Sequence, residues 1–89
     1  MKAVITVTGK DSVGIIAAVS AFCAEQSANI TEITQSVLSE YFAMIMIVDM
    51  SEAKMGLAEL AAECAELGKQ IGMSIYMQHE DIFNAMHNV

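Results

Sequence analysis

The chain has 89 residues, 55% of them hydrophobic, and its eleven acidic residues against four lysines and no arginine give a net charge of −7. A chain of this length forms one domain that buries only about 60% of the surface of its unfolded form, so a partner subunit is an expected source of stability. The negative charge repels phosphate backbones and anionic lipids, which argues against nucleic-acid and membrane partners.

The expected compartment is the cytoplasm. No apolar run reaches the roughly 18 residues that span a membrane, and no signal peptide precedes the first predicted strand. Cys23 and Cys64 each lie beside alanines in the middle of a helical pattern, where a free thiol behaves as a small buried hydrophobe. We therefore predict two free cysteines in a reducing compartment rather than a disulfide.

The first half of the chain predicts a strand, a helix and a second strand. In residues 2–8, side chains typical of β strands fall alternately on two faces, which predicts a strand. A turn follows, in which Asp11 and Ser12 are candidate N-caps, and apolar residues at helical spacing then predict a helix to about Ala28. Residues 29–38 are rich in β formers without clean alternation, which indicates a strand with a bulge near Glu32.

The second half predicts a strand, a helix, a strand and a tail. Residues 41–50 are apolar at nearly every position, which is typical of a central strand covered on both faces. Ser51 is the expected N-cap of a second helix, whose buried stripe includes Cys64. Residues 73–78 alternate again, and Asp81 is expected to cap a short apolar tail.

The order βαββαβ predicts an α+β fold of the ferredoxin-like type. Right-handed crossovers place both helices on one face of a four-stranded antiparallel sheet with strand order 4-1-3-2. We expect this domain at residues 1–80 and a C-terminal helical tail, packed on the same domain, at residues 81–89. The strand at residues 29–38 is then an edge without proline or lysine, which favours pairing with another copy of the chain. A homodimer is predicted.

The loop from Gly9 to Gly14 is the candidate ligand site, because a glycine turn before a helix presents backbone N–H groups to an anion. Asn29 is expected at the opposite end of the sheet. Antiparallel pairing of the second strands about a two-fold axis would bring it to the partner's loop. The predicted site takes a small amino acid or related zwitterion and comprises Lys10, Asp11, Ser12, Val13, Gly14, Asn29 and Ile30. Alternatively, Asp11 only caps a helix and Asn29 only shapes a turn.

No metal, cofactor or catalytic residue is predicted. His79, Glu80, Asp81 and His87 have metal-ligating chemistry, but their spacing matches no established site. The eight methionines fall mostly on strand positions and are interpreted as core rather than as copper ligands. Acyl-phosphate hydrolysis would need an arginine to hold the phosphate, and RNA recognition would need surface aromatic residues flanked by basic ones. We therefore do not expect an enzyme.

Three segments of the sequence are the strand that ends in Gly9-Lys10-Asp11, the Gly14-Ile15 pair that opens the helix, and the Asn29-Ile30 pair that opens the second strand. Together they resemble the ACT domain, a ligand-sensing module of amino-acid metabolism. The segments at residues 41–46 and 78–87 are more narrowly similar to a family of bacterial proteins made of one ACT domain. ACT domains more often carry a basic residue and proline where this chain has Ser12-Val13.

The resemblance implies a regulatory domain that usually dimerises and often binds an amino acid between subunits. More distantly, the chain resembles half of a tandem-ACT regulator such as the repressor of the glycine cleavage system. That likeness implies the alternative function, a ligand-independent protein–protein interaction module that regulates a partner enzyme or transcription factor.

Overall fold

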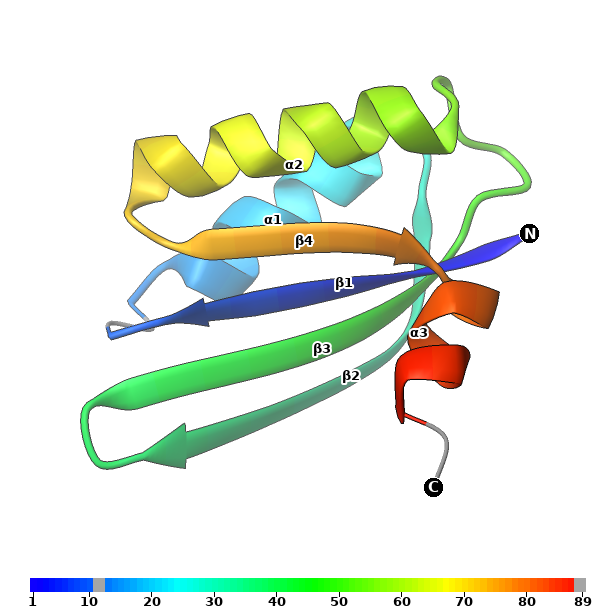
Figure 1. Ribbon diagram of the computed structural model, residues 1–89. Coiled ribbons are helices and arrows are strands. Elements are labelled where there is room, and N and C mark those ends of the chain that lie inside the picture. Colours follow the sequence, from blue (N-terminus) through cyan, green and yellow to red (C-terminus); the bar gives the residue numbers. More distant parts are fainter. Residues whose placement is uncertain (11–12, 88–89) are drawn as a thin grey trace.

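The computed structural model describes residues 1–10 and 13–87, without the side chain of His87. Among these residues, three helices and four strands follow one another (Figure 1): β1 (Lys2–Gly9), α1 (Ile15–Glu25), β2 (Asn29–Leu38), β3 (Tyr41–Asp49), α2 (Leu57–Ile71), β4 (Ser74–His79) and α3 (Glu80–His87). Within this described part of the chain, no helix has the length and apolar character needed to cross a membrane.

The four strands form one antiparallel sheet in the order β2-β3-β1-β4, which is the predicted 4-1-3-2 order read in reverse. Helices α1 and α2 lie together against one face of this sheet, and α3 lies at its other side (Figure 1). The ferredoxin-like fold is therefore confirmed. The bulge expected near Glu32 is also confirmed, because the register between β2 and β3 shifts between Ile30 and Glu32.

The core fills the space between the sheet and the two long helices. Ile5 of β1 lies between Met46 of β3 and Met77 of β4, so alternate residues of three strands point to the same side. Buried residues of both helices meet this surface. They include Cys23 and Cys64, which are free thiols as predicted. Burial raises the pKa of Cys23 to about 11 and that of Cys64 to about 12.

Helix α1 is shorter at both ends than the sequence pattern predicts. Its N-cap is Gly14, at φ 75°, so neither Asp11 nor Ser12 holds the N-cap position. The Gly14 carbonyl accepts the first helical hydrogen bond, from the Ala18 N–H at 3.0 Å. At the other end the helix stops at Glu25, because Ser27 adopts a left-handed backbone conformation that a helix cannot continue through.

The expectation that Ser51 caps α2 is wrong. Ser51 instead closes a turn after β3, where its N–H and its Oγ both donate to Asp49 Oδ1, at 2.9 and 2.6 Å. These bonds lower the pKa of Asp49, chiefly through the Ser51 hydroxyl. The helix begins six residues later, at Leu57 behind Gly56. A side chain suited to a helix cap is equally suited to a turn, and here the turn forms.

Strand β3 is central, but only one of its faces is fully buried, which corrects the prediction of cover on both. Phe42, Met44, Met46 and Val48 point to the helices and are buried, whereas the alternate residues Ala43, Ile45 and Ile47 are only half-buried. The two-layer architecture explains this difference, because α1 and α2 both occupy the same side. On the open side, Phe83 and Met86 of α3 line a small cavity with Ile45.

Candidate functional site

The predicted loop lies where β1 ends. Lys10 and Gly14 are exposed there, and Val13 is 85% exposed. Asp11 and Ser12 fall outside the described residues. The first turn of α1 begins directly behind Gly14, so the residues one turn before Ile15 to Ala17 belong to the loop and not to the helix. A helix N-terminus of this kind favours a negatively charged group.

Asn29 and Ile30 lie at the other end of the sheet. Asn29 pairs with Asp49, which also pairs with Lys2, the first residue of β1. Gly9, the last residue of β1, is seven residues further along that strand, a distance of about 23 Å at 3.3 Å per residue. One protomer therefore does not bring Asn29 to its own loop. Asn29 is exposed, and Ile30 is half-buried against the core.

Strand β2 is an exposed edge. Nine of its ten residues are exposed, with Ile30 as the exception, and β3 is its neighbour on one side. Ile33 and Val37 lie in register with Met46 and Phe42, so they point to the helix side, yet 44% and 67% of their surfaces are exposed. Helix α1 does not extend over this strand far enough to cover them. The edge carries both unpaired backbone groups and uncovered apolar side chains.

His79 and Asp81, two of the four C-terminal residues with metal-ligating chemistry, lie where α3 begins. His79 Nδ1 accepts a hydrogen bond from the Asp81 N–H at 3.0 Å, so the imidazole holds the first turn of α3. Asp81 lies inside that turn rather than at the N-cap, which corrects its predicted role. Among the side chains that the structure describes, no three His, Cys, Asp or Glu residues are grouped to hold a metal. The side chain of His87 is outside that set, so the absence of a metal stays a prediction.

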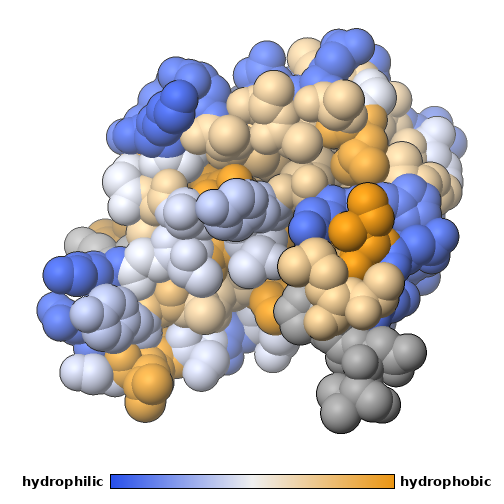
Figure 2. Space-filling model, viewed as in Figure 1, coloured by the Kyte–Doolittle hydropathy of each residue, from blue (hydrophilic) through white to orange (hydrophobic). Residues whose placement is uncertain are grey.

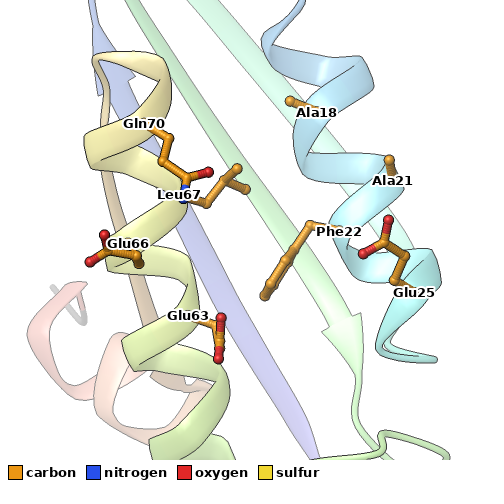
Figure 3. Close-up of a pocket in the computed structure, with 8 residues that line it drawn as sticks. All are labelled: Ala18, Ala21, Phe22, Glu25, Glu63, Glu66, Leu67 and Gln70. Atoms are coloured by element: carbon orange, nitrogen blue, oxygen red, sulfur yellow. The ribbon is translucent and has the colours of Figure 1, made fainter.

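A groove of about 250 Å³ runs between the two long helices. Phe22 of α1 and Leu67 of α2 point toward one another across it (Figure 3). Glu25, Glu63 and Glu66 also line it, so the groove has an apolar centre and acidic surroundings. Such a surface suits a protein segment that carries apolar and basic side chains.

Two further hollows meet at the end of the sheet where β1 finishes, and no pattern in the sequence pointed to them. Their volumes are about 320 and 610 Å³, and Thr8, Gly9 and Tyr41 line both. The larger one also reaches Lys69 of α2. Lys69 is 59 positions from Lys10, so only the folded topology brings the two together. The chain has only four lysines and no arginine, so a pair of lysines brought together by the fold is a signal worth searching for.

The strand order, the single face covered by two helices and the antiparallel pairing define a ferredoxin-like α+β domain. Within this class the chain belongs to the ACT domain family, whose model matches residues 2–78. Helix α3 lies beyond the matched segment.

Relatives match this chain over nearly the whole of both sequences. The chain is 49% identical to a UPF0237 protein of Clostridium acetobutylicum over the whole of both chains. It is 46% identical to a UPF0237 protein of Methanopyrus kandleri, over 99% of this chain and 98% of that one. Among solved structures, an ACT domain protein from Streptococcus pneumoniae superposes with a TM-score of 0.84 at 44% identity, over 98% of each chain.

A more distant structure shares the fold alone. A putative glycine cleavage system transcriptional repressor superposes with a TM-score of 0.76 at 13% identity, and the match covers 86% of this chain and 45% of that one. ACT domains are regulatory modules that often bind small molecules. Membership of the family therefore points to regulation, while the ligand has to be argued from the residues.

Proposed function

We propose that the protein is a non-enzymatic regulatory homodimer that binds a small amino acid or similar metabolite at its subunit interface. The observation that carries the proposal is the β2 edge, exposed along nine of its ten residues and without lysine or proline. A domain of this size gains stability when such an edge pairs with another chain. Antiparallel pairing about a two-fold axis gives each dimer two equivalent clefts.

Each cleft would combine one protomer's loop with the start of its partner's β2. The N–H groups at the start of α1, behind Gly14, would hold the ligand carboxylate. The side-chain oxygens of Asp11 and of the partner's Asn29 would accept from the ligand ammonium group. Lys10, Ser12, Val13 and the partner's Ile30 would complete the walls. In the sheet order, β3 and β2 separate β1 from the partner strand, so the loop has to reach across both.

The first test is a panel of amino acids added to the protein during thermal unfolding. A compound that binds only the native dimer raises the melting temperature, by an amount that grows with its concentration. Calorimetry with that compound on Asp11→Ala and Asn29→Ala then tests the site. We expect both substitutions to weaken binding strongly, and wild-type affinity in both would contradict the interface site.

Mixing the two variants tests whether one site uses two protomers. In a mixed dimer, both substitutions fall in one cleft and the other cleft is intact. After subunit exchange the mixture should therefore bind ligand at roughly one quarter of the wild-type stoichiometry, although each variant alone binds weakly. A mixture that binds no better than its components would show that Asp11 and Asn29 do not act across the interface.

The second candidate function is ligand-independent regulation of a partner protein. The groove between α1 and α2 favours it, because its apolar centre at Phe22 and Leu67 is flanked by three glutamates (Figure 3). An amino-acid panel that leaves the melting temperature unchanged while the dimer persists would favour this function. Substitution of Phe22 and Leu67 by serine would then be expected to abolish regulation of the partner without dissociating the dimer.

A further inference from the structure

The two hollows at the end of β1 lie in a single protomer and share Thr8, Gly9 and Tyr41 as lining residues, and we treat them together as one groove. The smaller part, of about 320 Å³, is lined mainly by carbon, with Leu38, Tyr41 and Ala43 among its walls. The larger part, of about 610 Å³, extends to Lys10, Lys69 and Ser74. This groove lies at the left-hand end of the sheet in Figure 1, where the β2–β3 hairpin and the α2–β4 turn meet the end of β1. In Figure 2, apolar atoms are visible among polar ones over the hairpin.

Positive charge gathers in the larger part. It holds two of the four lysines in a chain with a net charge of −7, and none of the described residues that line it is acidic. Lys10 Nζ is 5.9 Å from the centre of the Tyr41 ring, a cation–π distance that keeps the ammonium group beside the groove. Lys69 Nζ approaches Glu66 only to 3.9 Å, and the side chains are 77% and 61% exposed. An ion pair of this kind contributes little and leaves Lys69 available.

A purely structural role accounts for one of the lysines. Lys69 lies in the last turn of α2, where a cation offsets the negative end of the helix dipole. That role does not involve Lys10, which comes from the end of β1, and it does not explain the apolar hollow beside Tyr41. The three features together describe a groove with a cationic end and an apolar end, with Tyr41 between them.

We propose that this groove binds a small carboxylic acid that has an aliphatic or aromatic body and no amino group. The carboxylate contacts Lys10 and Lys69, and the body lies against Tyr41, Leu38 and Ala43. An amino acid is disfavoured because no described lining residue offers a carboxylate to its ammonium group, which would instead face two lysines. Both hollows are open to solvent, so a ligand there would be held along one side by the apolar wall and the two lysines. The site needs no second protomer, so it is distinct from the proposed interface site, although Lys10 borders both.

Phenylbutyrate and phenylbutylamine are matched probes, because they share one body and differ in the charged group. Calorimetry on the full 89-residue protein should detect phenylbutyrate and not the amine. Lys69→Ala should raise the phenylbutyrate dissociation constant at least about tenfold. Lys54→Ala is the control, since it removes the same charge from an exposed residue in the loop before α2, outside the groove. It should leave the dissociation constant unchanged.

The proposal is overturned if phenylbutyrate does not bind at millimolar concentration, if the amine binds equally well, or if Lys54→Ala weakens binding as much as Lys69→Ala. Isocaproate in place of phenylbutyrate decides whether the body is aliphatic or aromatic, and binding of either acid supports the site. The Asn29→Ala variant separates this proposal from the interface site. Phenylbutyrate should titrate it as it titrates the wild type, whatever happens to amino-acid binding.

Discussion

The centre and the edge of the sheet differ in how far a single chain pairs their backbone groups and buries their side chains. At the centre, β1 has a hydrogen-bonded neighbour on each side, and its helix-facing residues Ala3, Ile5 and Val7 are buried. At the edge, β2 pairs on one side with β3, and even its helix-facing Ile33 and Val37 are exposed. The centre therefore depends on the fold of one chain, whereas the edge would be covered by a second chain in the proposed dimer.

The largest expected contrast between the two regions is in thiol reactivity. Cys23 and Cys64 are buried over the centre, and with pKa values of about 11 and 12 they carry roughly one thiolate per thousand and per ten thousand molecules at pH 8. A thiol introduced on β2 by Ser36→Cys occupies an exposed position. We expect Ellman's reagent to modify this introduced thiol promptly at pH 8, and the two native thiols more than about a hundredfold more slowly until urea unfolds the protein. Equal rates for all three thiols would show that the centre is open.

Truncation of cross-strand partners tests the same contrast in stability. Met46 at the centre is fully buried and lies opposite Ile33 at the edge. Met46→Ala should lower the free energy of unfolding by about 2–5 kcal/mol, because it leaves a cavity. Ile33→Ala should lower it by less than about 1 kcal/mol. Urea denaturation at one fixed protein concentration measures both, and similar losses would remove the distinction between centre and edge.

Close packing of α2 on β4 supports the centre from the helix side. A Cβ at Gly68 would lie 2.6 Å from the Met73 carbonyl oxygen, a backbone atom that cannot turn aside. Gly68→Ala is therefore expected to cost about 1–3 kcal/mol. Gly56→Ala is the matched control, since a Cβ there meets nothing within 4 Å, and its cost should stay below about 1 kcal/mol from the weaker N-cap. Thermal unfolding of both variants measures the loss of stability. If Gly68→Ala lost no more stability than Gly56→Ala, the packing of α2 on β4 would be looser than the structure indicates.

A charge on the edge should weaken association without unfolding the protomer. Val37→Lys adds one cation to each copy of β2, so the paired edge of a symmetric dimer carries it twice. We expect its dissociation constant to rise at least about tenfold, which is ~1.4 kcal/mol. Tyr76→Lys makes a comparable change at an exposed position of β4 and should leave the dimer intact. Sedimentation velocity distinguishes the two variants, and a stronger effect from Tyr76→Lys would move the interface to the β4 side.

Local patterns in the sequence were enough to predict the centre of the fold. Alternation in β1, the apolar run of β3 and the handedness of the crossovers determine the strand order, and the loss of alternation correctly indicated the bulge before Glu32. Helix starts were less predictable, because Ser51 serves a turn as readily as a cap. The apolar run of β3 predicts cover on both faces, although the predicted placement of both helices on one face of the sheet already implies that the other face is more open.

The candidate site was predictable only in part. The register confirms that Gly9 and Asn29 lie at opposite ends of the sheet, as the topology required. The groove beside Lys69 was missed because its walls come from β1, the β2–β3 hairpin and the end of α2. Tertiary packing brings these distant segments together, and the local hydrophobic pattern of a sequence does not predict that packing. The site across two protomers depends in addition on an interface that one chain does not contain.

The mass of the wild-type protein in solution tests the central claim most directly, because the interface site cannot exist without a dimer. Static light scattering after size exclusion, at micromolar concentration, should report twice the 9.6 kDa chain mass. A mass of 9.6 kDa that persists as the concentration rises would contradict the account, since the β2 edge would then remain unpaired.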